Sequence, residues 1–399
     1  MPQQALAGFK VVDLGHHIAG PYCTKLLAEL GAEVVKIERP DGDPVRKMGP
    51  FFQDDPHPEK SLLYLYLNTG KKSITLNLKT ELGKKVFKDL VKDADILMEN
   101  FSPRVMPGLG LDYPILEKLN PGLVMTSISN FGQTGPYRDY KATDLNIMAI
   151  GGLMYMNGEP EREPLTFGGG LQAQYQGGAQ GFAATMIALW YKEWSGEGQH
   201  VDVSLMECIT QVLEYPDLVY QITGEIYQRT GTAWVNLPAW GVYPCKDGYV
   251  GLVHGAPRRW RQIGKLMGIR EFEDLSIYAR RRELRDQIDA LMLPWLLEHT
   301  KDEVYKMAQA QKPEIPASPV RTPADLVNSE HFKERGYFVE VDHPITGPKL
   351  YPGAPVKLSE TPYQISRAPV LGEHNEEIYC QRLGYTKDDL VRMKGEGVV

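Results

Sequence analysis

The sequence predicts an α/β protein built on an open, doubly wound parallel sheet. The clearest observation is a strand–helix–strand unit near the N-terminus. It consists of the apolar run 10–14, a helical pattern that opens at Pro21, and a second apolar run at 33–38. Proline is favoured at the first position of a helix, and Gly31 suits its end. Two strands joined by a helix within about 30 residues form a parallel, right-handed unit.

The second observation is that this unit repeats. Strand patterns at 73–78 and 95–100 flank a helical pattern at 81–94, and a further strand pattern occupies 123–129. Open sheets of this kind bind ligands beyond the carboxyl ends of their strands. The first of these turns, at 15–21, reads GHHIAGP. It lacks the GxGxxG pattern that holds a dinucleotide, so NAD is not expected.

The second half of the chain lacks the regular alternation of strands and helices, which predicts a second domain. At 399 residues the chain is long enough for two domains, because single cores stop growing at roughly 250–300 residues. The glycine-rich segment 165–189 predicts a turn, with Gln174, Tyr175, Gly177 and Gly178 at a bend. The further elements expected are a helix at 179–193, a strand at 200–205, a long helix at 206–224, a hairpin at 240–253, a proline-rich linker at 312–327, and two short helices near the C-terminus.

Composition and charge exclude several classes of function. The formal net charge of −7 provides no basic surface for nucleic acid. No apolar run approaches the roughly 20 residues of a membrane span, and the N-terminus has no signal-peptide core. We therefore expect a cytoplasmic protein with neither nucleic acid nor a membrane as partner. The histidines and cysteines form no ligand cluster, so no metal is expected.

Cations recur where the predicted strands end, which favours a ligand with several phosphates. Glu38 ends the second strand, where an acid could bind a ribose, but Arg39 follows it directly and suits a phosphate better. A plain surface charge is the alternative interpretation of Arg39. The cations that indicate a phosphate ligand are Arg39, Lys71, Lys72, Lys79, Arg104 and Lys141.

Taken together, motifs along nearly the whole chain resemble those of the class III CoA-transferase family. They occur in the family's order. The segments that carry the resemblance are LAGFKVVDLGHHIAGPYCTKLLAELGAEVVKIERP, NTGKKSITLNLKT, ADILMENFSP, LGLDYPILEKLNPGLV, SNFGQTGP, GGLMYMNGEP, GEGQHVDVSLME, VYPCKDGYV and RAPVLGEHNEEI.

The resemblance implies a fold, an assembly and a ligand. It implies a large Rossmann-like domain made from both chain ends, residues 1–199 and 326–399, and a smaller α+β domain at 200–325. Two subunits would interlock as rings, with coenzyme A or its acyl ester as the substrate bound between domains. The residues at the family's CoA-binding positions are Ile18, Ala19, Arg39, Leu76, Lys79, Asn100, Phe101 and Lys141. Arg104 lies near Gly108, a position at which many members carry an arginine.

The sequence departs from the family at the nucleophile. Active members use an aspartate that attacks the acyl-CoA, forming a mixed anhydride and free CoA thiolate. Gln174 occupies that position here. An amide has no anionic oxygen at neutral pH and cannot form the same anhydride. The resemblance therefore predicts the non-catalytic subunit of a heteromeric CoA-transferase, whose homologous partner subunit supplies the aspartate.

Two alternatives stay open. An active homodimer could use another carboxylate, with Asp144, Glu159, Glu161 and Glu163 as candidates. A protein of a different class could bind acyl-CoA without turnover. The departure at Gln174 resembles two-subunit members that act on succinyl-CoA and benzylsuccinate, so succinyl-CoA and a benzylsuccinate-type aromatic acid are the expected substrates. The aromatic residues that would suit such an acid are Tyr215, Tyr220, Trp234 and Trp240.

Overall fold

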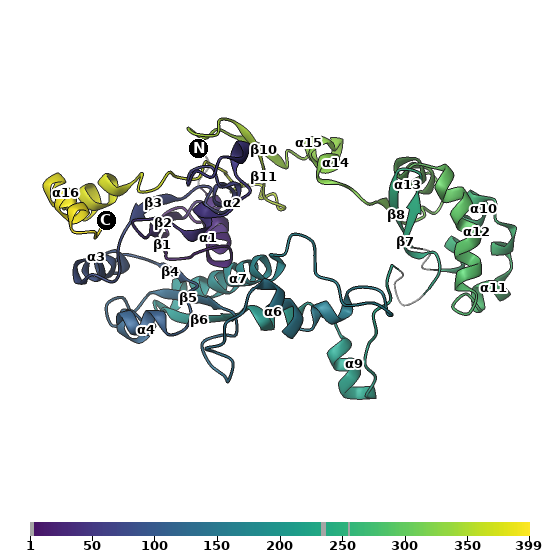
Figure 1. The fold of residues 1–399 in the computed structure, drawn as a ribbon, viewed down its shortest axis with the longest axis horizontal. Helices are drawn as coiled ribbons and strands as arrows, with labels where there is room; N and C mark the ends of the chain where they lie inside the picture. Colours follow the sequence, from purple (N-terminus) through teal and green to yellow (C-terminus); the bar gives the residue numbers. More distant parts are fainter. Residues whose placement is uncertain (1–3, 233–236, 254–255) are drawn as a thin grey trace. The chain divides into compact units, whose positions relative to one another are not determined.

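The computed structural model describes residues 4–232, 237–253 and 256–399, and they form two compact units (Figure 1). The larger unit comprises Met1–Leu153, Phe167–Glu214 and Lys333–Val399, and the smaller comprises Met154–Thr166 and Tyr215–Phe332. These boundaries differ from the expected small domain at 200–325. The strand β6 (Gln199–Ser204) pairs in parallel with β5 (Val124–Ser129), so this part of the chain belongs to the larger unit.

The larger unit contains the predicted parallel sheet. Its six strands lie in the order β3-β2-β1-β4-β5-β6, and every neighbouring pair is parallel. This is the doubly wound order, in which the direction of winding reverses between β1 and β4. The remaining strands are β1 (Lys10–Asp13), β2 (Glu33–Glu38), β3 (Lys72–Thr75) and β4 (Ile96–Glu99).

Successive residues of each strand enter different cores, because side chains alternate between the two faces of a sheet. Val11 packs with Leu27 of α1 (Ala19–Glu29) and Leu189 of α7 (Gln172–Ser195). Val12 packs instead with Phe87 of α3 (Glu81–Val91). The central strands are therefore buried on both faces, as near-continuous apolar runs predict for a parallel sheet.

The helices divide between the two faces. With α1 and α7 on one side, the other side is covered by α3 and by two segments from the C-terminal end of the chain. Further elements of the larger unit are two short 3-10 helices (Pro44–Lys47 and Phe52–Asp54), α2 (Leu62–Leu67), α4 (Val105–Leu109), α5 (Tyr113–Leu116), α6 (Asp144–Ile150), α8 (Leu205–Gln211), β10 (Phe338–Val341), β11 (Lys349–Pro352), the π-helix at Glu376–Arg382 and α16 (Lys387–Gly395).

The expected bend at Gln174 is wrong, because α7 begins at Gln172 and runs unbroken to Ser195. The glycines serve close packing instead of a turn. A Cβ at Gly177 would lie 2.0 Å from Leu205 Cδ2, and one at Gly178 would lie 2.7 Å from the Ala19 carbonyl oxygen. Two adjacent glycines predict a turn from sequence, but here they let neighbouring elements approach the helix.

The expected long helix at 206–224 is also wrong. The chain forms α8 and then α9 (Pro216–Thr223), with Glu214 between them at a φ of 69°. Proline at position 216 cannot continue a helix from the preceding turn and instead begins the next one.

The smaller unit has its own core around an antiparallel sheet. The predicted hairpin is confirmed as β7 (Trp240–Cys245) paired with β8 (Gly248–Val253). The expected linker at 312–327 is wrong in part, because β9 (Ala317–Pro319) adds to β8 as a third strand. The helices of this unit are α9, α10 (Pro257–Met267), α11 (Leu275–Ala279), α12 (Arg285–Glu298), α13 (Lys301–Gln309) and α14 (Pro323–Asn328), with α15 (Glu330–Glu334) at its boundary.

Two kinds of feature are absent from the described residues. None of their helices has the length and apolarity that crossing a membrane requires. No group of three or more histidine, cysteine or acidic side chains in this part of the chain is arranged to hold a metal ion.

Candidate functional site

A cavity of about 750 Å³ lies at the carboxyl ends of the strands in the larger unit. Residues at the carboxyl ends of three neighbouring strands line it: His17 to Ala19 after β1, Asn100 and Phe101 after β4, and Ser129, the last residue of β5, with Asn130 after it. The winding of the sheet reverses between β1 and β4, and ligands of doubly wound sheets bind at that point.

The Asn100 side chain joins the two central turns. Its Oδ1 accepts from the His16 backbone N–H at 2.7 Å, and its Nδ2 donates to the His16 carbonyl oxygen at 2.9 Å. Glu99 fixes the second turn, since its Oε2 accepts from the Phe101 N–H at 2.8 Å. The glycines of the first turn allow this approach, because a Cβ at Gly20 would lie 3.0 Å from the Asn100 Oδ1.

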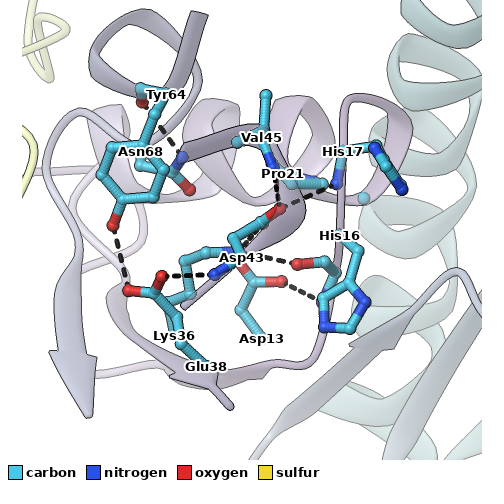
Figure 2. Close-up of polar contacts among 12 residues, drawn as sticks. Asp13, His16, His17, Pro21, Lys36, Glu38, Asp43, Val45, Tyr64 and Asn68 are labelled. Atoms are coloured by element: carbon cyan, nitrogen blue, oxygen red, sulfur yellow. Dashed lines mark hydrogen bonds and ion pairs between the residues drawn. The ribbon is translucent and has the colours of Figure 1, made fainter. Parts of the chain in front are cut away.

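A buried network of charged side chains supports the first turn from below (Figure 2). Lys36 donates to the Gly15 carbonyl oxygen at 2.6 Å and pairs with Asp43 at 2.8 Å. Asp43 also accepts from the His17 N–H at 3.3 Å, and His17 has a φ of 57°. Asp13 accepts from the Gly15 N–H at 2.7 Å. The network thus holds the backbone of the turn at Gly15 and at His17.

Glu38 and Lys71 belong to the same buried network. Glu38 binds the Arg46 guanidinium through both oxygens, at 2.7 and 2.9 Å, and also accepts from the Ser73 and Tyr64 hydroxyls. Lys71 lies 3.0 Å from Asp13, and both are buried. Glu38, at a position where an acid could have bound a ribose, and Lys71, which we expected to contact a phosphate, therefore already have buried partners and are not free to bind a ligand.

Burial shifts the pKa of the groups beside the central turns in opposite senses. Burial, assisted by the positive charge of Lys36, lowers the pKa of His16 to about 4. Burial raises the pKa of Glu99 to about 7, although hydrogen bonds from Ser127 and Phe101 oppose the shift. Both shifts follow from the cost of placing a charge in a poorly solvated site. His16 is consequently neutral at pH 7, and its ring packs edge-on against Phe101, with centroids 4.9 Å apart.

Gln174 lies in the first turn of α7 and lines the cavity. Gly178 is one turn further along the same face of the helix, where it meets the Ala19 carbonyl oxygen. The contact brings the start of α7 next to the start of α1, whose first residue, Ala19, lines the cavity together with the preceding Ile18. The position of Gln174 therefore depends on the bare backbone at 178.

Asp144 is the carboxylate beside Gln174. Its Oδ1 accepts from the Gln174 N–H at 3.1 Å, and the side chain lines the same cavity. Burial raises the pKa of Asp144, while the N–H groups of Gln174 and Ala173 oppose that shift. A carboxylate on the first N–H groups of a helix satisfies donors that lack intrahelical partners. Asp144 thus holds the start of α7.

Exposed cations line the mouth of the cavity. Arg104 makes a two-point ion pair with Asp139, with both N–O distances 2.8 Å. Its side chain is 76% exposed, so the pair is open to solvent. Lys141 is exposed and lines the same cavity. Asp139 is a partner that sequence reasoning missed, because it is 35 positions away from Arg104 and no local pattern relates the two.

Seven of the residues expected at the site lie together in this cavity: Ile18, Ala19, Asn100, Phe101, Arg104, Lys141 and Gln174. Three others lie elsewhere in the larger unit. Leu76 is buried in the core beneath the sheet, while Arg39 and Lys79 are exposed and are not part of the cavity lining. Lys72, which we also expected to bind phosphate, pairs with Glu33 and Glu377.

The other expected residues belong to the smaller unit. The acidic residues Glu159, Glu161 and Glu163 are exposed there. Among the aromatic residues, Tyr215 and Tyr220 are exposed, Trp240 is half-buried, and Trp234 lies outside the described residues.

Comparison with known proteins gives consistent matches over the whole chain. The family model described as CoA-transferase family III matches residues 6–375. The alpha subunit of succinyl-CoA–L-malate CoA-transferase from Chloroflexus aurantiacus is 32% identical over 403 residues, 100% of this chain and 93% of the relative. The beta subunit of that enzyme is also 32% identical, over 99% of this chain and 98% of the relative.

Two further matches agree. Subunit BbsE of succinyl-CoA:(R)-benzylsuccinate CoA-transferase from Thauera aromatica is 32% identical over 411 residues, 98% of each chain. The crystal structure of a CAIB/BAIF family protein from Brucella suis superposes with a TM-score of 0.85 at 32% identity, covering 95% of this chain and 99% of that one. Because the family model matches residues 6–375 and these relatives are 32% identical over nearly the whole chain, the chain belongs to CoA-transferase family III.

Proposed function

We propose that the chain is the non-catalytic subunit of a heteromeric CoA-transferase. The observation that carries this proposal is Gln174, an amide at the cavity wall where the family resemblance expects the nucleophilic aspartate. The rest of the cavity keeps its polar lining, including Asn100 and Lys141. A cavity that keeps polar and cationic groups but lacks the nucleophile is what a scaffold subunit would retain.

The ligand we propose is an acyl-CoA, with its phosphates at the exposed cations and its thioester beside Ile18 and Ala19. Arg104 and Lys141 at the cavity mouth support the first assignment, because phosphates favour exposed cationic donors. The second is supported by the N-terminus of α1, an end of a helix that favours negative charge. A volume of about 750 Å³ suits a ligand of this size.

For the acids exchanged we propose succinyl-CoA as the CoA donor and a benzylsuccinate-type aromatic acid as the acceptor. Support comes from the names of the relatives, since two of these CoA-transferases have succinyl-CoA in their names and one of the two names also contains (R)-benzylsuccinate. The partner proposed is a homologous subunit that carries the aspartate, because the succinyl-CoA–L-malate enzyme has alpha and beta subunits that are both similar to this chain.

A CoA-exchange assay tests the proposal. The chain alone should not exchange CoA between succinyl-CoA and labelled succinate, and activity should appear when the aspartate-bearing subunit is added. Gln174→Asp should give the isolated chain measurable exchange. Gln172→Asp is the matched control, because it places a carboxylate on the same first turn of α7, outside the cavity lining. Exchange by the unmodified chain alone would refute the proposal.

A second candidate function is an active enzyme in which Asp144 replaces the missing nucleophile. Its proximity to Gln174, with 3.1 Å between the Asp144 Oδ1 and the Gln174 nitrogen, is the observation in its favour. Asp144→Asn separates the candidates: it should abolish exchange by the isolated chain if Asp144 is the nucleophile. A scaffold chain has no such activity to lose.

A further inference from the structure

A second cavity, of about 160 Å³, lies beside α4 in the larger unit. Its walls come from the ends of β4 and β5, from α4 and α5, and from the loop that follows β5. We call it the α4 pocket. Ser102, Pro103 and Arg138 line both this pocket and the main cavity, so the two spaces adjoin. Gln174 lines the main cavity but not the α4 pocket, which is therefore a neighbouring space and not part of the site described above.

One wall of the α4 pocket is ordered by contacts within the chain. Glu99 of β4 lies opposite Ser127 of β5 in the register of the sheet, and both are buried. Glu99 accepts from the Phe101 N–H at 2.8 Å, and the Ser127 hydroxyl lies 2.9 Å from His200 Nε2. The Tyr113 ring stacks on the His200 ring, with centroids 5.5 Å apart. These groups therefore already have partners.

Two donors that belong to the lining of the pocket lack a partner. Gln133 Nε2 and Arg138 Nε are both buried, and neither has a hydrogen-bond acceptor within the described part of the chain. The ion pair of Arg138 with Asp139 has an N–O distance of 4.0 Å, which is too long for a hydrogen bond. Gln133 is held by its backbone, whose N–H donates to both oxygens of Asp202 at 3.0 and 2.9 Å. Buried donors without acceptors are costly, so the pocket is suited to a ligand that accepts from both.

The charges around the pocket favour a ligand with one negative charge. Arg138 supplies one positive charge, and a planar guanidinium matches the geometry of a carboxylate. Asp112 also lines the pocket, and Asp202 is bonded to Gln133, so a second negative charge on the ligand would be repelled. Burial raises the pKa of Glu99 to about 7, so at pH 6 this group is mostly protonated and repels an anion little.

The size and the apolar walls of the pocket limit the ligand to a short chain. A volume of about 160 Å³ corresponds to about five water molecules, which leaves room for an acid of about six non-hydrogen atoms. Apolar walls with a few polar groups are typical of sites for small molecules. The apolar residues that line the pocket are Pro103, Met106, Pro107, Pro114 and Met125.

We propose that the α4 pocket binds a short-chain carboxylate with a single negative charge. Its carboxylate accepts from Arg138 Nε and Gln133 Nε2, and its alkyl chain lies against Met106 and Met125. The inference goes beyond the proposed function and does not depend on it, because no group of the pocket has to act as a nucleophile. An acid bound there would lie next to the main cavity, since Arg138 lines both spaces.

Methyl NMR of the full chain, labelled with ¹³C at the methionine methyl groups, tests the inference at pH 6. Met106 and Met125 line the α4 pocket, whereas Met48 lines the main cavity. Titration with butyrate should shift the Met106 and Met125 signals to saturation and leave the Met48 signal nearly unchanged. Butyramide, which has the same shape without the charge, and inorganic phosphate should each bind about tenfold more weakly than butyrate.

Three variants assign the binding to the two donors. Arg138→Gln removes a charged donor and should raise the dissociation constant for butyrate by about tenfold. Gln133→Leu removes a neutral donor and should raise it by about fivefold, while the backbone N–H of residue 133 still bonds Asp202. Lys118→Gln is the matched control, because it removes the same charge from an exposed position outside the pocket and should leave the constant unchanged.

Several results would overturn the inference. If butyrate produced no saturable shift at Met106 and Met125, water would be the partner of both donors. Equal shifts at Met48 would place butyrate in the main cavity instead. Binding of butyramide or phosphate as tight as that of butyrate would refute the ligand class, and an equal loss in Lys118→Gln and Arg138→Gln would refute the pocket. These results are independent of the exchange assay, which tests Gln174 and leaves the α4 pocket untouched.

Discussion

The charged residues below the first turn and those at the mouth of the cavity differ in what they are free to bind. Lys36 and Lys71 are buried, and each lies within 3.0 Å of a buried carboxylate. Arg104 and Lys141 are exposed, and the ion pair of Arg104 with Asp139 is open to solvent. A cation near the site is therefore available to a ligand only when its side chain is exposed to solvent. The buried lysines, which we call the buried set, support the turn that follows β1. The exposed cations Arg104 and Lys141, which we call the exposed set, are free to bind a ligand.

The largest expected effect is on the buried set. Replacing Lys71 with Met leaves Asp13 as a buried charge without its main counterion, which should lower the free energy of unfolding by about 3–5 kcal/mol. Burial alone would raise the pKa of Asp13, and Lys71 and Lys36 reverse that shift. Urea denaturation measures the loss. Lys79→Met, on an exposed lysine, should change stability by less than about 0.5 kcal/mol.

The comparison would fail if these two lysine variants lost similar stability. Equal losses would mean that the pairing of Lys71 with Asp13 contributes no more than an exposed surface charge.

The pH dependence of the free energy of unfolding tests the burial of the groups beside the two central turns. The pKa of His16 is about 4 in the folded protein, below its ordinary value of 6.5, so between these values the unfolded chain binds more protons. Stability should therefore fall as the pH is lowered from 6.5 to 4, by up to about 3 kcal/mol from this residue. His16→Gln should flatten the slope of unfolding free energy against pH in this window.

Glu99 should contribute a slope of the opposite sign. Its pKa is about 7 when folded and 4.5 ordinarily, so the folded state holds the extra proton between these values. Stability from this group is present below pH 4.5 and is lost as the pH rises through 7. Glu99→Gln should accordingly make the measured slope more positive, again by up to about 3 kcal/mol across the window. Slopes that change in the same direction in both variants would contradict the assigned shifts.

The exposed set should affect binding more than stability. Arg104→Ala removes one cation from the cavity mouth and should weaken CoA binding by about fivefold, or roughly 1 kcal/mol. Its stability should change by less than about 1 kcal/mol, because its ion pair is exposed. Titration calorimetry with CoA at low and high salt measures the effect, which should shrink as salt screens the charge. Arg382→Ala, outside the cavity, serves as the control.

The smallest expected effect concerns Asp139. Its ion pair competes with a phosphate for the Arg104 guanidinium, so Asp139→Asn should strengthen CoA binding by about two- to fivefold. The gain should disappear in the double variant with Arg104→Ala. Calorimetry of the two single variants and the double variant forms the cycle, and a gain that persists without Arg104 would show that Asp139 acts through another group.

The alternation of strands and helices made the sheet predictable from sequence. Each apolar run predicted as a strand in the first half is a strand, because its side chains are buried on both faces of the sheet. The neighbouring residues Val11 and Val12 of β1, which lie in different cores, are an example. Helix boundaries were harder to predict. The glycines at 177 and 178 predicted a bend, but their role is contact with Leu205 and Ala19, which is a property of the folded chain.

The site was predictable only where local sequence determines it. Residues in the turns after strands, such as Asn100 and Phe101, line the cavity because the carboxyl ends of parallel strands meet at one edge. The charge pairs could not be foreseen, since Asp13 and Lys71 are 58 positions apart. Spacing in sequence does not reveal which cations are buried with a partner. The sequence alone therefore provided no reason to expect that Lys71 is buried and Arg104 exposed.

Mass spectrometry of trapped intermediates tests the central claim most directly. The chain and its aspartate-bearing partner are incubated with succinyl-CoA, quenched with hydroxylamine, and digested, and the modified peptide is identified. We expect the adduct on the partner's peptide and an unmodified Gln174 peptide from this chain, with no adduct when the chain is incubated alone. An adduct on any carboxylate of the isolated chain, Asp144 included, would contradict the account.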